Sequence, residues 1–235
     1  MRKYILFLVF PFLCLKPLSA QIGISVMEGY GKYAMDDLKT LQHSYLVNLP
    51  VNAEIVNNFP ARPFPEIKVF YFLKILSAGL TYSFHSTGSK VNYKDYSGEI
   101  NYTQITNLNA FGQFVRLRFL NVKHMRASLS FQTNLAYTNL KLSQTVQIFD
   151  ENASEAYKLK AFSIFGEPGL DVIFPFKNFE IGLFGGYCID TKGEFYLNND
   201  ASMHITLPDN KNARTNWSGY RIGIMLNYLL NFKKS

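Results

Sequence analysis

The segment Met125–Tyr137 reads MRASLSFQTNLAY, and its side chains alternate between apolar or lipid-tolerant residues and polar ones. Leu129 and Leu135 fall on one face, whereas Ser128 and Gln132 fall on the other. Because successive side chains of a β-strand point to opposite faces, the segment predicts a strand with one apolar and one polar face. It is also long enough to cross a bilayer, which takes about 9 to 11 residues when the strand is tilted.

The same alternation recurs in seven further segments. The expected strands are 22–31, 67–73, 78–85, 111–119, 125–137, 162–176, 181–189 and 218–232. Long connections at 32–66, 86–102, around 150–155 and 192–216 alternate with short turns at 74–77, 120–124 and 177–179. An even number of strands joined in this way predicts an all-β fold, an eight-stranded antiparallel up-and-down transmembrane β-barrel with long outer loops and short periplasmic turns.

The first long loop, 32–66, carries its own signals. Residues 36–46 are expected to form a short helix, and Pro50, Pro60, Pro63 and Pro65 argue against regular strand pairing around them. Two strand residues also depart from the pattern. Glu28 falls on an apolar face, so we expect it above the membrane or turned inward by a bulge. Pro168 cannot donate to a ladder, which predicts a bulge or a locally open edge.

The N-terminus predicts export. Arg2 and Lys3 precede an apolar stretch at 4–15 and a small-residue cleavage site that ends at Ala20, so residues 1–20 are expected to be a signal peptide and 21–235 one barrel domain. Loss of Arg2, Lys3 and Lys16 lowers the formal net charge from +7 to +4. The remaining basic residues are scattered along the sequence, which gives no case for nucleic acid. Cys188 alone remains, so no intramolecular disulfide is possible.

The barrel hypothesis predicts where the aromatic and charged residues lie. With odd strands running outward, two aromatic girdles are expected. They comprise Tyr30, Tyr82, Phe84, Tyr137, Tyr187 and Tyr220 at the outer rim and Phe119, Phe174, Phe176 and Phe232 at the inner rim. The inward faces carry charged residues that are expected to form one paired network in the lumen. They are Arg116, Arg118, Arg126, Arg221, Glu167, Asp171 and Asp190.

Signals for chemistry are weak. The histidines His43, His85, His124 and His204 have no metal-ligand spacing, and no metal or cofactor is expected. His85 and Ser86, with Glu99 to orient the base, are the one hint of a nucleophile and base. Adjacent strand residues point to opposite faces, however, so polarity at the barrel rim explains these residues better than catalysis does.

One region resembles a known group of proteins. The runs FHSTGSKV at 84–91 and KDYSGEI at 94–100 resemble the third strand and second outer loop of uncharacterised small outer-membrane barrels of the Bacteroidetes. The C-terminal Gly223, Leu226 and Tyr228 similarly resemble a signal for the barrel-assembly machinery. The resemblance implies a barrel in a bacterial outer membrane, and it implies no catalytic residues.

The sequence therefore favours a monomeric, non-enzymatic outer-membrane barrel whose exposed loops bind a partner or stabilise the envelope. Its expected partners are outer-membrane lipid, the assembly machinery and an extracellular or envelope protein. One alternative is an esterase that modifies outer-membrane lipid through His85 and Ser86. A second is a soluble lipocalin-like barrel, which would need an apolar lumen. A third is a subunit of a larger envelope complex.

Overall fold

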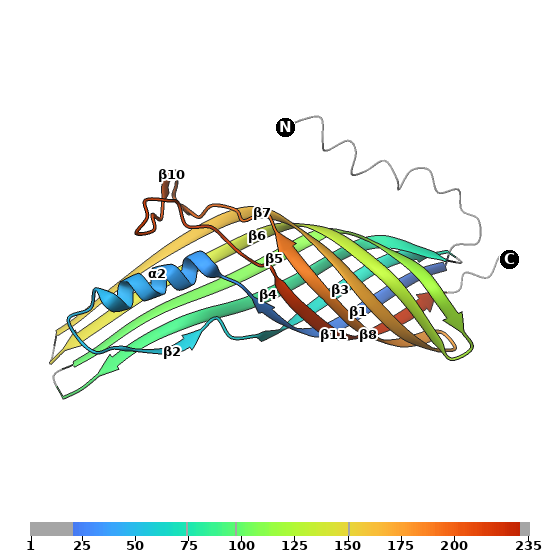
Figure 1. Ribbon diagram of the computed structural model, residues 1–235, viewed down its shortest axis with the longest axis horizontal. Helices are drawn as coiled ribbons and strands as arrows, with labels where there is room; N and C mark the ends of the chain where they lie inside the picture. Colours follow the sequence, from blue (N-terminus) through green and yellow to red (C-terminus); the bar gives the residue numbers. More distant parts are fainter. Residues whose placement is uncertain (1–20, 74, 97, 150, 231–235) are drawn as a thin grey trace.

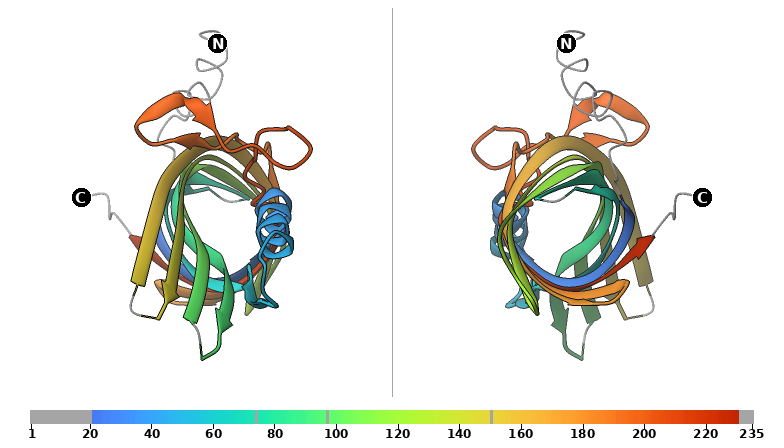
Figure 2. Two further views of the ribbon diagram at one scale, coloured as in Figure 1. Left: turned by 90° about the vertical axis from the view of Figure 1, so that its left-hand side faces the viewer. Right: turned by 90° about the vertical axis from the view of Figure 1, so that its right-hand side faces the viewer.

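Eight strands form a closed antiparallel ring in a computed structural model of the chain, which describes residues 21–230 apart from 74, 97 and 150. The ring strands are β1 (Gln21–Tyr33), β3 (Arg62–Phe72), β4 (Leu76–Lys94), β5 (Gly98–Val122), β6 (Met125–Ile148), β7 (Glu151–Phe176), β8 (Phe179–Asp190) and β11 (Gly219–Leu230). Each pairs with the next in chain order, and β11 pairs with β1 to close the ring (Figures 1 and 2). The predicted eight-stranded up-and-down barrel is confirmed. The expected signal peptide and Phe232 lie outside the described residues.

The alternation in β6 places apolar side chains on the outside of the ring. Leu129 is 57% exposed and Leu135 63%, whereas the intervening Ser128 and Gln132 are buried in the lumen. The same holds across the ring, where Ile224 is exposed and Asp171 is fully buried. The exterior of the ring is therefore apolar and its interior polar. In a soluble protein, including a lipocalin-like barrel, apolar side chains fill the interior instead.

Four strands continue far beyond the ring at one end. β4 to β7 have 19, 25, 24 and 26 residues, whereas β1, β8 and β11 have 12 or 13. A strand of 24 residues spans roughly 80 Å, more than twice the hydrocarbon thickness of a bilayer. We call the projecting part the extension, made of residues 86–94, 98–110, 136–148 and 151–161 (left in Figure 1). The segments 86–102 and 150–155 were predicted as loops, but residues 86–94, 98–102 and 151–155 instead belong to the ends of long strands.

In the extension the two faces of the sheet exchange polarity. In β6, Leu140 and Leu142 are buried on the inward face, and Asn139 and Lys141 lie on the outward face. Side chains continue to alternate without a break, but the apolar ones point outward up to Tyr137 and inward after it. The prediction of loops failed because a polar outward face was interpreted as the absence of a strand.

A cap covers the inward face of the extension. The cap consists of α2 (Asp36–Val47) and residues 191–218. Within the second segment, the short strands β9 (Tyr196–Leu197) and β10 (Asp200–His204) extend the sheet at the edge of β7. The side chains of the cap pack with the extension into one core. Members of this core include Met35, Leu38, Leu108, Ala110, Leu140, Leu142, Leu159, Phe195, Leu207 and Trp217. The predicted helix at 36–46 is confirmed, and within the described residues no helix is long and apolar enough to cross a membrane.

Two prolines of the first long loop lie inside a strand, contrary to the prediction. Pro63 and Pro65 belong to β3 and pair with Tyr30 and Glu28 of β1. Pairing of β3 with β4 begins only at Glu66. At both prolines, therefore, β3 pairs with β1 on one side but not with β4 on the other, and a missing N–H donor is tolerated there. The edge of β4 beyond this point is covered by β2 (Glu54–Asn58) instead.

The two residues that interrupt the strand pattern behave differently. Glu28 lies in regular register opposite Ile224, with exposed Val26 and Tyr30 beside it, so the expected bulge is absent and the carboxylate faces outward within the apolar belt. Around Pro168 the ladder between β7 and β8 is interrupted, since pairing stops at Gly166 and resumes at Gly169. The predicted local opening at Pro168 is confirmed.

Candidate functional site

Arg221 is the centre of a buried ionic cluster in the lumen. Its Nη1 donates to Glu167 Oε2 at 2.5 Å and its Nη2 to Glu66 Oε2 at 2.9 Å, and all three side chains are fully buried. Lys68 Nζ lies 2.7 Å from the other oxygen of Glu66, and Gln132 donates to Glu167. The cluster joins β11, β7, β3 and β6 across the barrel.

Two further ion pairs lie in the same lumen. Arg116 Nε donates to Asp171 Oδ2 at 3.1 Å, and Arg126 pairs with Glu180. Arg118, also predicted for the network, lies over the ring of Phe72 at 4.5 Å. The attraction between buried charges of opposite sign that are hydrogen-bonded to each other offsets the cost of removing them from water. These side chains occupy the interior of the ring as a polar plug.

The structure adds three charged residues to the network that the sequence analysis missed, and removes one. Glu66, Lys68 and Glu180 all point into the lumen. Glu66 and Glu180 each lie one residue before a predicted strand, 67–73 or 181–189, and Lys68 lies inside the first of these strands but was not assigned to the lumen. Asp190, the last residue of β8, instead contacts the cap, where its Oδ2 accepts hydrogen bonds from the Trp217 backbone N–H and from Thr215, both at 3.0 Å.

The weak catalytic candidates do not come together. His85 is buried in the lumen, where its Nδ1 lies 2.7 Å from the Tyr33 hydroxyl and its Nε2 lies 2.9 Å from Ser83 Oγ. Ser86 lies on the opposite face of β4, and Glu99, near the far end of the extension, pairs with Lys94 at 3.2 Å. The described residues contain no group of three or more histidine, cysteine or carboxylate side chains placed to hold a metal ion.

The aromatic residues predicted for the girdles point outward. Tyr30, Tyr82, Phe84, Tyr187 and Tyr220 are exposed at the end of the ring nearest the extension, and Phe119 and Phe176 at the other end, while Tyr137 and Phe174 are half-buried. Tyr187 and Tyr220 meet edge to face, with ring centroids 4.9 Å apart. Tyr71, Phe179 and Tyr228 are further exposed aromatic residues near the second end, and the sequence analysis did not include them.

Hydrogen bonds fix the cap to the barrel and its two parts to each other. Trp217 Nε1 donates to Thr138 Oγ1 at 3.0 Å, which ties the loop 191–218 to β6. Asn216 donates to Asp36 at 2.6 Å, and the Arg214 backbone N–H donates to Asp37 at 2.9 Å, so the same loop binds the first turn of α2. The two carboxylates also suit the positive end of the helix dipole. The cap is therefore a folded unit and not a set of free loops.

An apolar cleft opens between the two parts of the cap. It has a volume of about 260 Å³ and is lined by Leu41, Tyr102, Leu142, Tyr157, Leu159, Leu197, Met203, His204 and Ile205. Beside it, Tyr45 of α2 stacks on Tyr102 of β5 with ring centroids 4.1 Å apart. Burial raises the pKa of Tyr102 to about 12, so its hydroxyl is neutral at physiological pH. Tyr157 and Met203 are more than half exposed, and they form the accessible margin of the cleft.

The closed ring, the oily exterior and the polar plug can be compared with known proteins. No family model and no curated protein sequence matches this chain. Bacterial outer-membrane barrels are among the solved structures that match. The attachment invasion locus protein Ail of Yersinia pestis is 12% identical, with a TM-score of 0.40, and the match covers 91% of this chain and 100% of that one. Neisserial surface protein A is 10% identical, with a TM-score of 0.41, and the match covers 88% and 96% of the two chains. The outer-membrane protease OmpT of Escherichia coli is 11% identical, with a TM-score of 0.34, and the match covers 90% and 96%.

Proposed function

We propose that the protein is a non-enzymatic, monomeric barrel of a bacterial outer membrane that binds an envelope or extracellular protein through its cap. In this proposal residues 1–20 direct export, the oily belt of the ring contacts lipid, and the extension with its cap projects from the cell surface. Aromatic residues at both ends of the belt support the membrane location, because tyrosine and phenylalanine gather at the two interfaces of such barrels.

The observation that carries the binding function is the cleft between α2 and the β9–β10 segment. Its volume of about 260 Å³ is below the range of pockets that enclose whole small ligands, and it matches one large apolar side chain. Interfaces between proteins commonly depend on such an anchor residue that enters a desolvated pocket. Because the cap is held by hydrogen bonds to β6 and within itself, the cleft is preorganised, which reduces the entropy lost on binding.

The plugged lumen argues against a role as an open pore. Arg221, Glu66 and Glu167 link β11, β3 and β7 across the lumen, and Trp217 is fully buried. Eight-stranded barrels generally fill their interior with side chains. The proposed function therefore lies on the surface of the cap.

Site-specific photo-crosslinking in intact cells tests the proposal. A photoreactive phenylalanine analogue in place of Met203, at the margin of the cleft, should capture one discrete protein partner. The same analogue in place of Ser143, on the outward face of the extension, serves as the matched control and should not capture it. Equal crosslinking from both positions, or none from position 203 in cells that display the folded protein, would contradict the proposal.

A further inference from the structure

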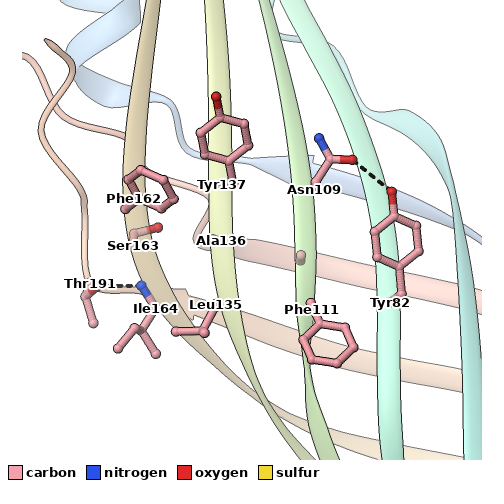
Figure 3. Close-up of a pocket in the computed structure, with 11 residues that line it drawn as sticks. Tyr82, Asn109, Phe111, Leu135, Ala136, Tyr137, Phe162, Ser163, Ile164 and Thr191 are labelled. Carbon is pink, nitrogen blue, oxygen red and sulfur yellow. Dashed lines mark hydrogen bonds between the residues drawn. The ribbon is translucent and has the colours of Figure 1, made fainter. Parts of the chain in front are cut away.

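A second apolar groove lies on the outside of the barrel and shares no lining residue with the cleft of the cap. It crosses β4 to β7 at the outer end of the ring and has a volume of about 640 Å³. Its walls include Tyr82, Phe111, Leu135, Tyr137, Phe162 and Ile164 (Figure 3). These side chains point away from the lumen, at the level of the aromatic rim. The groove therefore faces the lipid if the ring spans a membrane.

A polar hollow adjoins this groove on the side of the extension. It has a volume of about 330 Å³, and Asn107, Asn139, Lys141, Lys158 and Asn198 contribute to its lining. It follows the groove along the same strands and the same outward face, since Asn139 comes two residues after Tyr137 in β6. An apolar surface thus lies beside a polar one on the outward face of the same strands, and the polar one is rich in amide and basic side chains.

The pairing register brings together two lysines that line this hollow and places a third beside them. Lys141 of β6 lies directly opposite Lys158 of β7, and Lys160 lies next to them on the side of the groove. Like charges that face each other across an antiparallel pair are destabilising. None of the three forms an ion pair with a carboxylate in the described part of the chain, and Lys160 Nζ rests 5.5 Å from the Tyr196 ring. These basic residues appeared scattered in the sequence, and only the register brings them together.

We propose that this surface binds one phosphorylated lipid of the outer leaflet. Its acyl chain occupies the groove, and its phosphate lies between Lys141 and Lys158, where it removes their mutual repulsion and accepts hydrogen bonds from the neighbouring amides. An amphiphile with an anionic head matches both halves of the site, whereas a free anion would leave the apolar groove unfilled. The inference rests on the proposed membrane location and is independent of partner binding by the cap.

Quenching by brominated lipid tests this inference on the full-length mature protein in nanodiscs. Leu135→Trp places a fluorescent reporter in the groove, and the native Trp217 is buried in the cap and supplies a constant background. In nanodiscs of unlabelled phosphatidylcholine, a few mole per cent of brominated phosphatidic acid should quench the reporter several-fold more than the same fraction of brominated phosphatidylcholine does. The preference should disappear in Lys141→Gln/Lys158→Gln and persist in Lys141→Arg/Lys158→Arg.

Lys39→Gln/Lys90→Gln removes the same charge elsewhere on the cap and extension, and this control should keep the preference. Equal quenching by the two lipids, or equal loss in the two glutamine variants, would overturn the inference. Loss of the preference when inorganic phosphate is added would also overturn it, because the hollow would then be a site for soluble anions. Failure of the folded barrel to enter nanodiscs at all would count against the membrane location, so the two proposals fail separately.

Discussion

The ring and the extension are built from the same strands, but the inward face of these strands is polar in the ring and apolar in the extension. In the ring, the lumen side of β6 carries Ser128 and Gln132, and its outer side carries Leu129. In the extension, the inner side carries Leu140 and the outer side Lys141. The backbone, the pairing and the period of two are the same in both regions, and only the surroundings of each face differ.

The difference shows that alternation specifies a strand, whereas the phase of the alternation specifies what covers each face. Where the outer face meets lipid, the lumen must hold polar groups that satisfy one another. Where the outer face meets water, the inner face is free to be apolar and needs a cover, which α2 and residues 191–218 supply. The reversal after Tyr137 thus marks the point at which the strands leave the proposed membrane.

The largest effect should come from breaking the charged interior of the ring. Arg221→Met leaves Glu66 and Glu167 without their shared partner, and we expect the free energy of unfolding to fall by about 3–5 kcal/mol. Denaturant titration of the detergent-folded barrel, followed by its shift in gel mobility, measures this loss. Arg214→Met is the matched control, since its ion pair with Glu194 is 50% and 39% exposed and should be worth less than about 1 kcal/mol. Similar losses in both variants would contradict a cooperative lumen cluster.

A leucine exchange in each region should separate the stability of the cap from that of the ring. Leu140→Ala opens a cavity beneath the cap, and we expect the docked cap to lose about 2–5 kcal/mol. Tryptic cleavage at Lys39 of α2 should become faster while the heat resistance of the barrel is unchanged. Leu129→Ala, on the exposed outer face of the ring, creates no enclosed cavity and should leave the cleavage rate as it is. Joint melting of cap and ring in the first variant would show that they form one cooperative unit.

The smallest effect should be a loss of cap stability in alkali. Burial raises the pKa of Tyr102 to about 12, whereas in an undocked cap this phenol titrates near its usual value of about 10. The neutral phenol therefore stabilises the docked state fully below about pH 10, and this contribution, about 2–3 kcal/mol at most, is lost as the pH rises from about 10 to about 12.

The emission of Trp217 measures the alkaline change, because this only tryptophan of the sequence is buried in the cap core. The emission should shift to the red across the alkaline range in the wild type. The shift should begin at higher pH in Tyr102→Phe, which has no phenol to ionise. Tyr96→Phe removes an exposed phenol and should leave the wild-type profile unchanged. An identical profile in all three proteins would exclude Tyr102 as the cause.

The sequence alone determined the ring. Alternation in segments such as Met125–Tyr137 is a local property of the chain, so the number of ring strands, their outward faces and the helix at 36–46 were predictable from residue order. The lumen charges Arg116, Arg221, Glu167 and Asp171 were predictable for the same reason, because the face of each follows from its position in its own strand.

Only the tertiary structure decided which groups meet across strands. The register places Lys141 opposite Lys158 and brings Arg221 to Glu66, although 155 residues separate the latter two in the chain. Whether a polar outward face belongs to a loop or to a strand in water depends on what covers the opposite face. For the extension that cover is the cap, whose residues lie far from it in sequence, and no local pattern in the extension contains this information.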